Sequence, residues 1–236
     1  MVRSQALATA PARILIELGR SVRGVPLIME VLGDGPDSVL IVAGIHGNEP
    51  TGAIVAAQLA RFLESHPAFL NGRTVAIFAQ ANPDGLVSGR RTNANGVDLN
   101  RNFPATDWCL AEPDQTNHGP FSASEPETLA VMTAIEIIKP RRIVDIHSIE
   151  RGHHGNNYDG SAEHLAELMG YFNGYPVLGD IGYATPGALG NWAGIDGGIP
   201  TVTLELPRES NGLGCWRENT GALLAFIGAH FVPHGR

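Results

Sequence analysis

The chain has 236 residues, of which 43% are hydrophobic and 17% are charged, and its formal net charge is -8. This composition excludes an intrinsically disordered chain, because such chains combine few apolar residues with a high density of charge. It also argues against a nucleic-acid partner, since affinity for nucleic acid comes mainly from basic residues that neutralise phosphates.

Short apolar runs alternate with longer amphipathic stretches along the sequence. The runs predict strands at residues 25–32, 39–45, 74–79, 143–146, 175–178 and 201–206. The amphipathic stretches predict helices at residues 51–64, 124–138, 162–172 and 217–230. This alternation is typical of an α/β fold with a mixed, mostly parallel sheet flanked by helices. No linker or repeat interrupts it, so we expect residues 1–236 to form a single domain.

Local signals set the expected ends of some elements. Ser124 and Glu127 have the spacing of a capping box, so we expect Ser124 to be the N-cap of the helix at 124–138, which Pro140 ends. Residues 82–118, 150–160 and 179–198 are rich in glycine, asparagine and proline and predict loops. Loops of this length in a compact domain are usually functional.

Polar side chains of the kind that bind metals follow three of the predicted strands. The strand at 39–45 leads into His46 and Glu49, the strand at 143–146 leads into His147, and the last strand carries Glu205. Binding sites in open α/β sheets collect at the carboxyl ends of strands. His46 and Glu49 can converge on one cation, and a second histidine would complete a His₂Glu set with a fourth position left for water.

Two further features indicate a site. Glu205 lies between Leu204 and Leu206, and a carboxylate buried in such a run is unfavourable by several kcal/mol unless it has a partner or a function. Residues 82–104 interleave arginines and asparagines with turn formers, and such a donor-rich loop can bind carboxylates or polarise a carbonyl.

Together these motifs resemble the M14 zinc carboxypeptidase family. The matching motifs are His46-x-x-Glu49, Asn-Pro-Asp-Gly at 82–85, Gly-Val-Asp-Leu-Asn-Arg-Asn-Phe at 96–103, His147, and Glu205 within Thr-Leu-Glu-Leu-Pro. The resemblance implies a zinc carboxypeptidase-like fold. The residues around Arg91 and Glu205 are most similar to an amidase branch of the family, which cleaves the γ-D-glutamyl–diaminopimelate bond of murein peptides in cell-wall recycling.

The resemblance also implies a role for each matching residue. His46, Glu49 and His147 would bind one zinc ion per chain, and Glu205 would take the proton from the attacking water and pass it to the leaving amine. Arg91 would stabilise the oxyanion, with its neighbour Arg90 as the alternative. Asn100 and Arg101 would hold the terminal carboxylate of the substrate, and Asp98 would orient the first zinc histidine.

One family feature has no counterpart near its expected place. Carboxypeptidases carry a mobile tyrosine upstream of the catalytic glutamate, and residues 191–198 contain none. Tyr183 lies too far upstream for us to assign it from the sequence. The loss disfavours general trimming of protein C-termini and favours a specialised small substrate.

Two other functions remain open at this point. An N-acyl amino acid deacylase of the aspartoacylase or succinylglutamate desuccinylase type shares His-Gly-Asn-Glu and a similar Asp-Leu-Asn-Arg, but Asn-Pro-Asp-Gly at 82–85 argues against it. A zinc-binding protein without catalysis is the other alternative, and the intact Glu205 argues against it.

Partners and location follow from the same reasoning. The implied partner is a small anionic peptide, the murein tripeptide. No apolar run approaches the roughly 18 residues of a membrane span, and no signal peptide is recognisable. Cys109 and Cys215 lack metal spacing, so we expect free thiols in a cytoplasmic protein, although a bridge between them is an alternative. The oligomeric state is open, a homodimer included.

Overall fold

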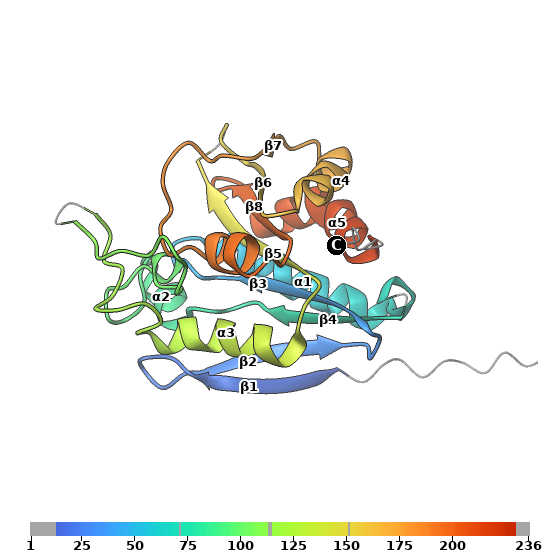
Figure 1. Cartoon of the computed structure of the whole chain (residues 1–236). Coiled ribbons are helices and arrows are strands. Elements are labelled where there is room, and N and C mark those ends of the chain that lie inside the picture. Colours follow the sequence, from blue (N-terminus) through green and yellow to red (C-terminus); the bar gives the residue numbers. More distant parts are fainter. Residues whose placement is uncertain (1–12, 71, 113–114, 151, 230–236) are drawn as a thin grey trace, which may run out of the picture.

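The computed structural model describes residues 13–70, 72–112, 115–150 and 152–229 (Figure 1). Within these residues eight strands form one sheet in the order β1-β2-β4-β3-β5-β8-β6-β7. The strands are β1 (Ile14–Arg20), β2 (Pro26–Leu32), β3 (Asp37–Ala43), β4 (Arg73–Phe78), β5 (Arg142–Ile149), β6 (Gly155–Asp159), β7 (Val177–Leu178) and β8 (Thr201–Pro207).

The centre of the sheet is parallel. Strands β4, β3, β5 and β8 run parallel to one another, whereas β1 and β2 form an antiparallel edge and β6 runs antiparallel to β8. The prediction of a mixed, mostly parallel sheet flanked by helices is therefore confirmed. Because β3, β5 and β8 are neighbours, their carboxyl ends meet at one edge of the sheet.

Helices cover both faces of the sheet. They are α1 (Pro50–Ser65), α2 (Pro83–Ser88), α3 (Pro126–Ile138), α4 (Glu163–Asn173) and α5 (Gly212–Gly228), with the short 3₁₀ turns η1 (Pro67–Leu70) and η2 (Leu99–Arg101) and the π-helix η3 (Gly190–Asp196). None of the helices in the described ranges has the length and apolarity needed to cross a bilayer.

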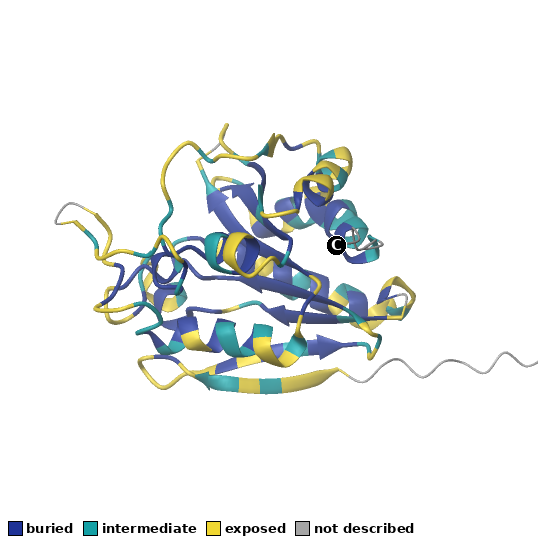
Figure 2. Ribbon diagram, viewed as in Figure 1, coloured by how far each residue is buried: buried dark blue, intermediate teal, exposed yellow. Residues whose placement is uncertain are grey.

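Two apolar layers hold the helices to the sheet. Successive side chains of a strand point to opposite faces, so Val39 and Ile41 of β3 pack with α1, α4 and α5, while Leu40 and Val42 pack with α3 and η3. Figure 2 shows the resulting buried interior along the central strands. Burial of one large apolar side chain stabilises the fold by about 1.5–3 kcal/mol, so this double core fixes the strand ends that carry the site.

The structure contains two strands that the sequence analysis did not predict. β1 is an edge strand whose Ile14 and Leu15 are exposed, so its sequence lacks the alternation that marks a half-buried strand. β6 lies inside the predicted loop 150–160. Its Asn156 and Asn157 are buried, and such polar residues are typical of loops rather than strands.

Several predicted ends and turns are also wrong. Glu125, not Ser124, is the N-cap of α3, because the Ser124 hydroxyl donates to the Glu125 carboxylate and Glu127 accepts from the Val22 amide. The Asn-Pro-Asp-Gly turn begins a helix, α2, whose N-cap is Asn82.

The C-terminal helix α5 begins at Gly212 rather than at residue 217, after an Asn211 side-chain cap. His230, the predicted end of this helix, lies outside the described residues. Cys109 is exposed and Cys215 is buried, and both are free thiols, as expected.

Candidate active site

Three side chains from two neighbouring parallel strands meet at the carboxyl edge of the sheet. His46 lies in the turn after β3, Glu49 is the residue before α1, and His147 lies in β5. The turn is tight, since a Cβ atom at Gly47 would lie 1.9 Å from the carbonyl carbon of Gly85. Glycine at position 47 therefore lets the chain pass close to α2 and turn His46 and Glu49 toward β5.

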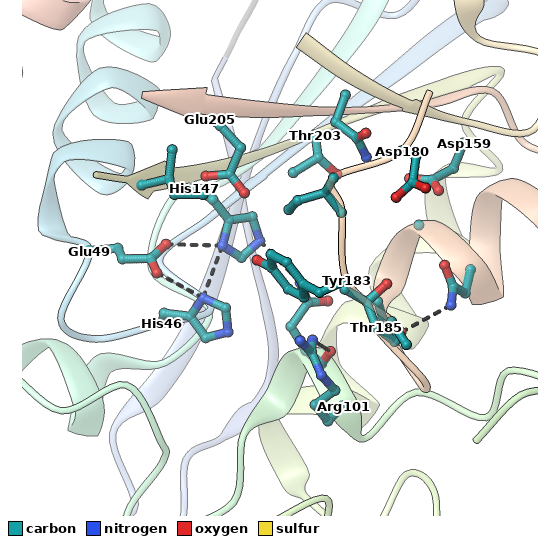
Figure 3. Close-up of a pocket in the computed structure, with 18 of the residues that line it drawn as sticks. His46, Glu49, Arg101, His147, Asp159, Asp180, Tyr183, Thr185, Thr203 and Glu205 are labelled. Carbon is teal, nitrogen blue, oxygen red and sulfur yellow. Dashed lines mark hydrogen bonds and ion pairs between the residues drawn. The ribbon is translucent and has the colours of Figure 1, made fainter. Parts of the chain in front are cut away.

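The ligating atoms of these residues face one another (Figure 3). His46 Nδ1 lies 3.0 Å from His147 Nδ1 and 3.2 Å from Glu49 Oε1, and His147 Nδ1 lies 3.1 Å from Glu49 Oε2. All three residues are buried. Two imidazole nitrogens and a carboxylate are the His₂Glu set that zinc uses in catalytic sites, so the donor set fits a single zinc ion.

Each histidine is oriented by a carboxylate behind it. Asp98 Oδ1 accepts from His46 Nε2 at 3.0 Å, as the resemblance implied, and Asp145 Oδ2 accepts from His147 Nε2 at 2.8 Å. Such contacts fix the tautomer that leaves Nδ1 free to bind a metal. Asp145 was missed in the sequence, although its position two residues before His147 places both side chains on the same face of β5.

The carboxylates of the metal cluster stay ionised in spite of their burial. Burial opposes ionisation of Glu49, but the charge of His46 and the hydrogen bond from His147 hold its pKa well below the ordinary value. Burial acts on Asp98 in the same way, and its contacts with His46 and Arg91 likewise hold its pKa low. Both groups therefore remain anionic and favour a cation between the histidines.

Glu205 lies next to His147 on the neighbouring strand. The two residues are partners in the β5–β8 ladder, and Glu205 is only 8% exposed. Burial raises the pKa of its carboxyl above the ordinary value, and no described residue donates a hydrogen bond to it. A carboxylate with a raised pKa beside a metal site can both accept and return a proton.

The structure brings Arg91, and not Arg90, into the site. Arg91 Nε donates to Asp98 Oδ2 at 2.8 Å, and its Nη1 lies 3.5 Å from Glu49 Oε1. Arg90 is exposed and does not line the cavity. Arg91 is therefore the arginine that can reach a substrate carbonyl over the metal cluster.

Asn100 and Arg101 lie on the opposite side of the cavity from Glu205, in η2. Arg101 Nη1 donates to the backbone oxygen of Asn100, and Asn100 Oδ1 accepts from the Leu189 amide. These contacts place an amide and a guanidinium side by side in the cavity wall. Such a pair can bind a carboxylate.

A cavity of about 350 Å³ extends from the metal cluster to a wall of acidic and polar residues. Asp159 of β6 and Asp180 line this wall with Thr203 close by (Figure 3), and Asn157 lines the same cavity. Burial, together with the charge of Asp145, raises the pKa of Asp159 to about 6. Asn157 Oδ1 is buried and accepts no hydrogen bond from the described residues. The sequence analysis missed this acceptor-rich wall, because its residues come from β6, β8 and a loop.

The tyrosine that the sequence analysis set aside also lies in the cavity. Figure 3 shows Tyr183 between Arg101 and the His46–His147 pair. Tyr183, which could not be assigned from the sequence, therefore lines the site. Distance along the chain was misleading, because the loop before η3 folds back over the cavity. Tyr183 lies in the predicted loop 179–198, and loops of this length are usually functional. This was the one sequence feature that pointed to a role for Tyr183 in the site.

Other candidate residues lie elsewhere. His153 and His154 do not line the cavity, and the ring of His154 packs edge-on against Tyr175. His118 Nδ1 bonds to the backbone oxygen of Cys109. His118 and His154 therefore contact other parts of the protein, and none of the three histidines lines the cavity.

Comparisons with known proteins agree with this geometry. The sequence profile of the zinc carboxypeptidase family, Peptidase M14, matches residues 4–160. The chain belongs to this family. It is 34% identical over 210 residues to murein peptide amidase A of Escherichia coli K12, covering 82% of this chain and 81% of the relative. A second murein peptide amidase A, from Vibrio campbellii, is 31% identical over 206 residues, covering 80% of this chain and 77% of that protein.

Solved structures show the same fold. The crystal structure of murein-tripeptide amidase from Escherichia coli O157 matches with a TM-score of 0.75 and 27% identity over 98% of both chains. Bovine thrombin-activatable fibrinolysis inhibitor, in complex with tick carboxypeptidase inhibitor, matches with a TM-score of 0.78 at 18% identity, over 92% of this chain and 89% of that chain. The second likeness concerns the fold alone. The protein is thus an enzyme of the zinc metallopeptidase and amidase class.

Proposed function

We propose that this enzyme hydrolyses the amide bond between γ-D-glutamate and diaminopimelate in murein tripeptide, with one zinc ion held by His46, Glu49 and His147. The observation that supports this choice of substrate is the mixed charge of the cavity. Beside the metal cluster lie donors for a carboxylate, at Asn100 and Arg101. Across the cavity lie Asp159 and Asp180, which form no ion pair with a lysine or arginine in the described part of the chain. The similarity to murein peptide amidases supports the same substrate.

Diaminopimelate matches this division of charge. It has one carboxylate beside the scissile amide, and at the far end of its side chain it has an ammonium group together with a second carboxylate. Asn100 and Arg101 would bind the carboxylate next to the amide. Asp159, with Asn157 and Asp180, would accept from the distal ammonium. A leaving residue with a neutral side chain would leave the Asp159 carboxylate without a partner.

The residues around the metal supply the proton transfers. A zinc ion bound there would act as a Lewis acid toward the carbonyl and lower the pKa of water. Glu205 accepts the proton of the water that attacks the carbonyl carbon and then gives it to the nitrogen of the leaving amine as the C–N bond breaks. The Arg91 guanidinium donates to the carbonyl oxygen as negative charge develops on it.

The proposed products are the dipeptide L-Ala-D-Glu, with its γ-carboxylate now free, and free diaminopimelate, with one water consumed for each bond broken. A role in cell-wall peptide recycling would place the enzyme in the cytoplasm with a small anionic peptide as its partner. The single catalytic domain and the cytoplasmic location stay predictions.

Product analysis tests the proposal. Zinc-loaded protein is incubated with L-Ala-γ-D-Glu-diaminopimelate, and free diaminopimelate is measured by mass spectrometry. We expect release by the native protein and a loss of about 100-fold or more in Glu205→Gln, because general acid–base catalysis contributes about 10²–10⁴-fold. Arg90→Gln, an exposed arginine outside the cavity, serves as the control and should be unaffected.

The opposite result would also be informative. If the tripeptide stays intact while N-acetyl or N-succinyl amino acids are deacylated, the deacylase alternative replaces this proposal. If Glu205→Gln keeps full activity, Glu205 is not the base.

A further inference from the structure

Arg208 lines the same cavity and has no role in the reaction described above. It follows β8 three residues after Glu205, and its backbone amide donates to the Ile149 carbonyl at 2.8 Å. Its side chain is 46% exposed. The guanidinium thus belongs to the mouth of the cavity rather than to the core.

The direction of β8 places Arg208 on the side of the metal cluster away from the acidic wall. Figure 3 shows Thr203 between Glu205 and Asp180, so the strand runs from the acidic wall toward the cluster. A strand rises about 3.3 Å per residue, so Arg208 lies roughly 10 Å further along the chain than Glu205. The leaving residue would occupy the Asp159 side, and the acyl part of the substrate would extend toward Arg208.

Most N–H groups of the Arg208 guanidinium make no hydrogen bond within the described residues. A guanidinium carries five N–H groups, and in this structure Nη2 of Arg208 makes one hydrogen bond, to the Ser148 carbonyl at 3.0 Å. Its ion pair with Glu49 is long, at 3.5 Å. The Glu49 carboxylate already contacts both cluster histidines and accepts from the Ser148 amide. Arg208 can therefore bind a further anion and keep its hydrogen bond to the Ser148 carbonyl.

The two other arginines that line the cavity already have contacts or proposed roles of their own. Arg91 forms a close ion pair with Asp98, at 2.8 Å, and Arg101 belongs to the wall that would bind the leaving residue. Among the described residues that line the cavity, Arg208 is the remaining arginine. The acyl side of the site thus has one available guanidinium.

We propose that Arg208 binds the free α-carboxylate of the γ-linked glutamate and so selects γ-glutamyl substrates. This inference rests on the proposed function. A γ-linked glutamate carries its α-carboxylate on the acyl side, a few bonds from the scissile carbonyl. An ordinary α-linked residue has a peptide bond in that place. Arginine suits this task because its planar fork matches a carboxylate with two parallel hydrogen bonds.

Two peptides that differ only in this carboxylate test the inference. One is L-Ala-γ-D-Glu-diaminopimelate, and in the other 4-aminobutanoate replaces the γ-D-glutamate, which removes the carboxylate and keeps the backbone length. We expect the native enzyme to prefer the first peptide by at least about 10-fold in kcat/KM, the range of a charged hydrogen bond. Arg208→Gln should abolish most of this preference by slowing cleavage of the first peptide alone.

Control variants separate recognition from a structural role. Arg208→Lys keeps the charge and should retain part of the preference, and Arg90→Gln should retain all of it. Binding of both peptides to Glu205→Gln protein, by calorimetry, gives a readout that does not need turnover. The Arg208→Gln change in that background should weaken binding of the first peptide only.

Each other outcome has a distinct meaning. If Arg208→Gln lowers kcat/KM for both peptides equally, Arg208 supports the Glu49 region and the inference is overturned. The same holds if the native enzyme does not distinguish the two peptides. If the native enzyme cleaves neither peptide, the proposed function itself has failed.

Discussion

Carboxylates in this site differ in function because their surroundings differ. Glu49 and Asp98 contact histidine or arginine, and these partners hold their pKa values low. For Glu205 and Asp159 burial is the largest influence and raises their pKa values, although His147 and His46 oppose this at Glu205. Pairs of acids whose surroundings push their pKa values apart commonly serve different steps. Here the first pair suits a cation site, and the second pair suits proton transfer and ammonium binding.

The raised pKa of Asp159 predicts a pH-dependent preference for cationic leaving residues. Its carboxyl is neutral below about pH 6 and anionic above it. The attraction for an ammonium group is therefore present above this pH and is lost as the pH falls through it. We expect KM for the diaminopimelate peptide to rise below about pH 6, measured across roughly pH 5–8.

Two comparisons assign this effect to Asp159 rather than to Glu205. Asp159→Asn should raise KM for the diaminopimelate peptide at neutral pH by about 10-fold, the range of a hydrogen bond to a charged group. It should also remove the change in KM near pH 6. A peptide that ends in norleucine, which has neither the distal ammonium nor the distal carboxylate, should show neither effect. A KM step that persists in Asp159→Asn would contradict the prediction.

The sequence analysis predicted the site residues that lie in or just after apolar strands. It missed the site residues whose position depends on contacts between distant parts of the chain. His46, His147 and Glu205 stand at or after runs of buried β-branched residues, so their meeting could be inferred from strand order alone. Tyr183 and Asp159 come from segments without an apolar pattern. Their place in the cavity depends on how the loop before η3 and the edge strand β6 fold around it.

The same contrast holds for strands and helices. β3, β5 and β8 are buried on both faces and are rich in apolar residues. Strands of this kind are recognisable in a sequence, and the predicted ends of these three lie within a few residues of the observed ends. β1 is an exposed edge strand, and β6 begins with buried asparagines. In β6, Asn156 and Asn173 exchange side-chain hydrogen bonds between the strand and α4. Tertiary partners of this kind are not visible in a single sequence.

The π-helix η3 approaches β6 so closely that a Cβ atom added at either of two of its glycines would meet Asp159. A Cβ at Gly190 would lie 2.1 Å from Asp159 Oδ2, and a Cβ at Gly194 would lie 2.8 Å from Asp159 Cβ. The first clash involves the mobile end of a side chain, and the second involves an atom fixed to the backbone. The two glycines therefore set the position of the Asp159 carboxylate in different ways.

Alanine substitutions should separate these two effects. We expect Gly190→Ala to change the free energy of unfolding by less than about 1 kcal/mol, since the gain in helix propensity offsets part of the clash. It should nevertheless raise KM for the diaminopimelate peptide, because it displaces the carboxylate. Gly194→Ala should lower the free energy of unfolding by about 1–3 kcal/mol, the range for overpacking.

Urea unfolding of each purified variant measures these changes, and steady-state kinetics give the KM values. Gly228→Ala in α5 is the matched control, since a Cβ there meets no atom within 4 Å. It should leave KM unchanged and keep or slightly raise stability. Equal stability losses for Gly190→Ala and Gly194→Ala would show that the Asp159 side chain cannot move aside.

The fold as a whole does not depend on the metal for its core. The apolar layers on both faces of the sheet join α1, α4 and α5 on one side and α3 and η3 on the other, and none of the three metal ligands belongs to them. The cluster instead joins the turn after β3, the start of α1 and the carboxyl-terminal part of β5. A bound ion would therefore stabilise the edge of the sheet that carries the site, and we expect the protein to fold without it.

Removal of zinc should thus abolish activity and lower the melting temperature without unfolding the protein at room temperature. A ligand present at about 1,000 times its Kd stabilises the native state by about 4 kcal/mol, and 1 kcal/mol corresponds to roughly 2–4 °C in a chain of this size. We expect a fall of about 10 °C on chelation, measured by calorimetry, and recovery when zinc is added back. Glu49→Gln should melt at the chelated temperature with or without zinc, since it loses a charged ligand. Loss of far-ultraviolet circular dichroism at 25 °C on chelation would instead show that the metal holds the whole fold together.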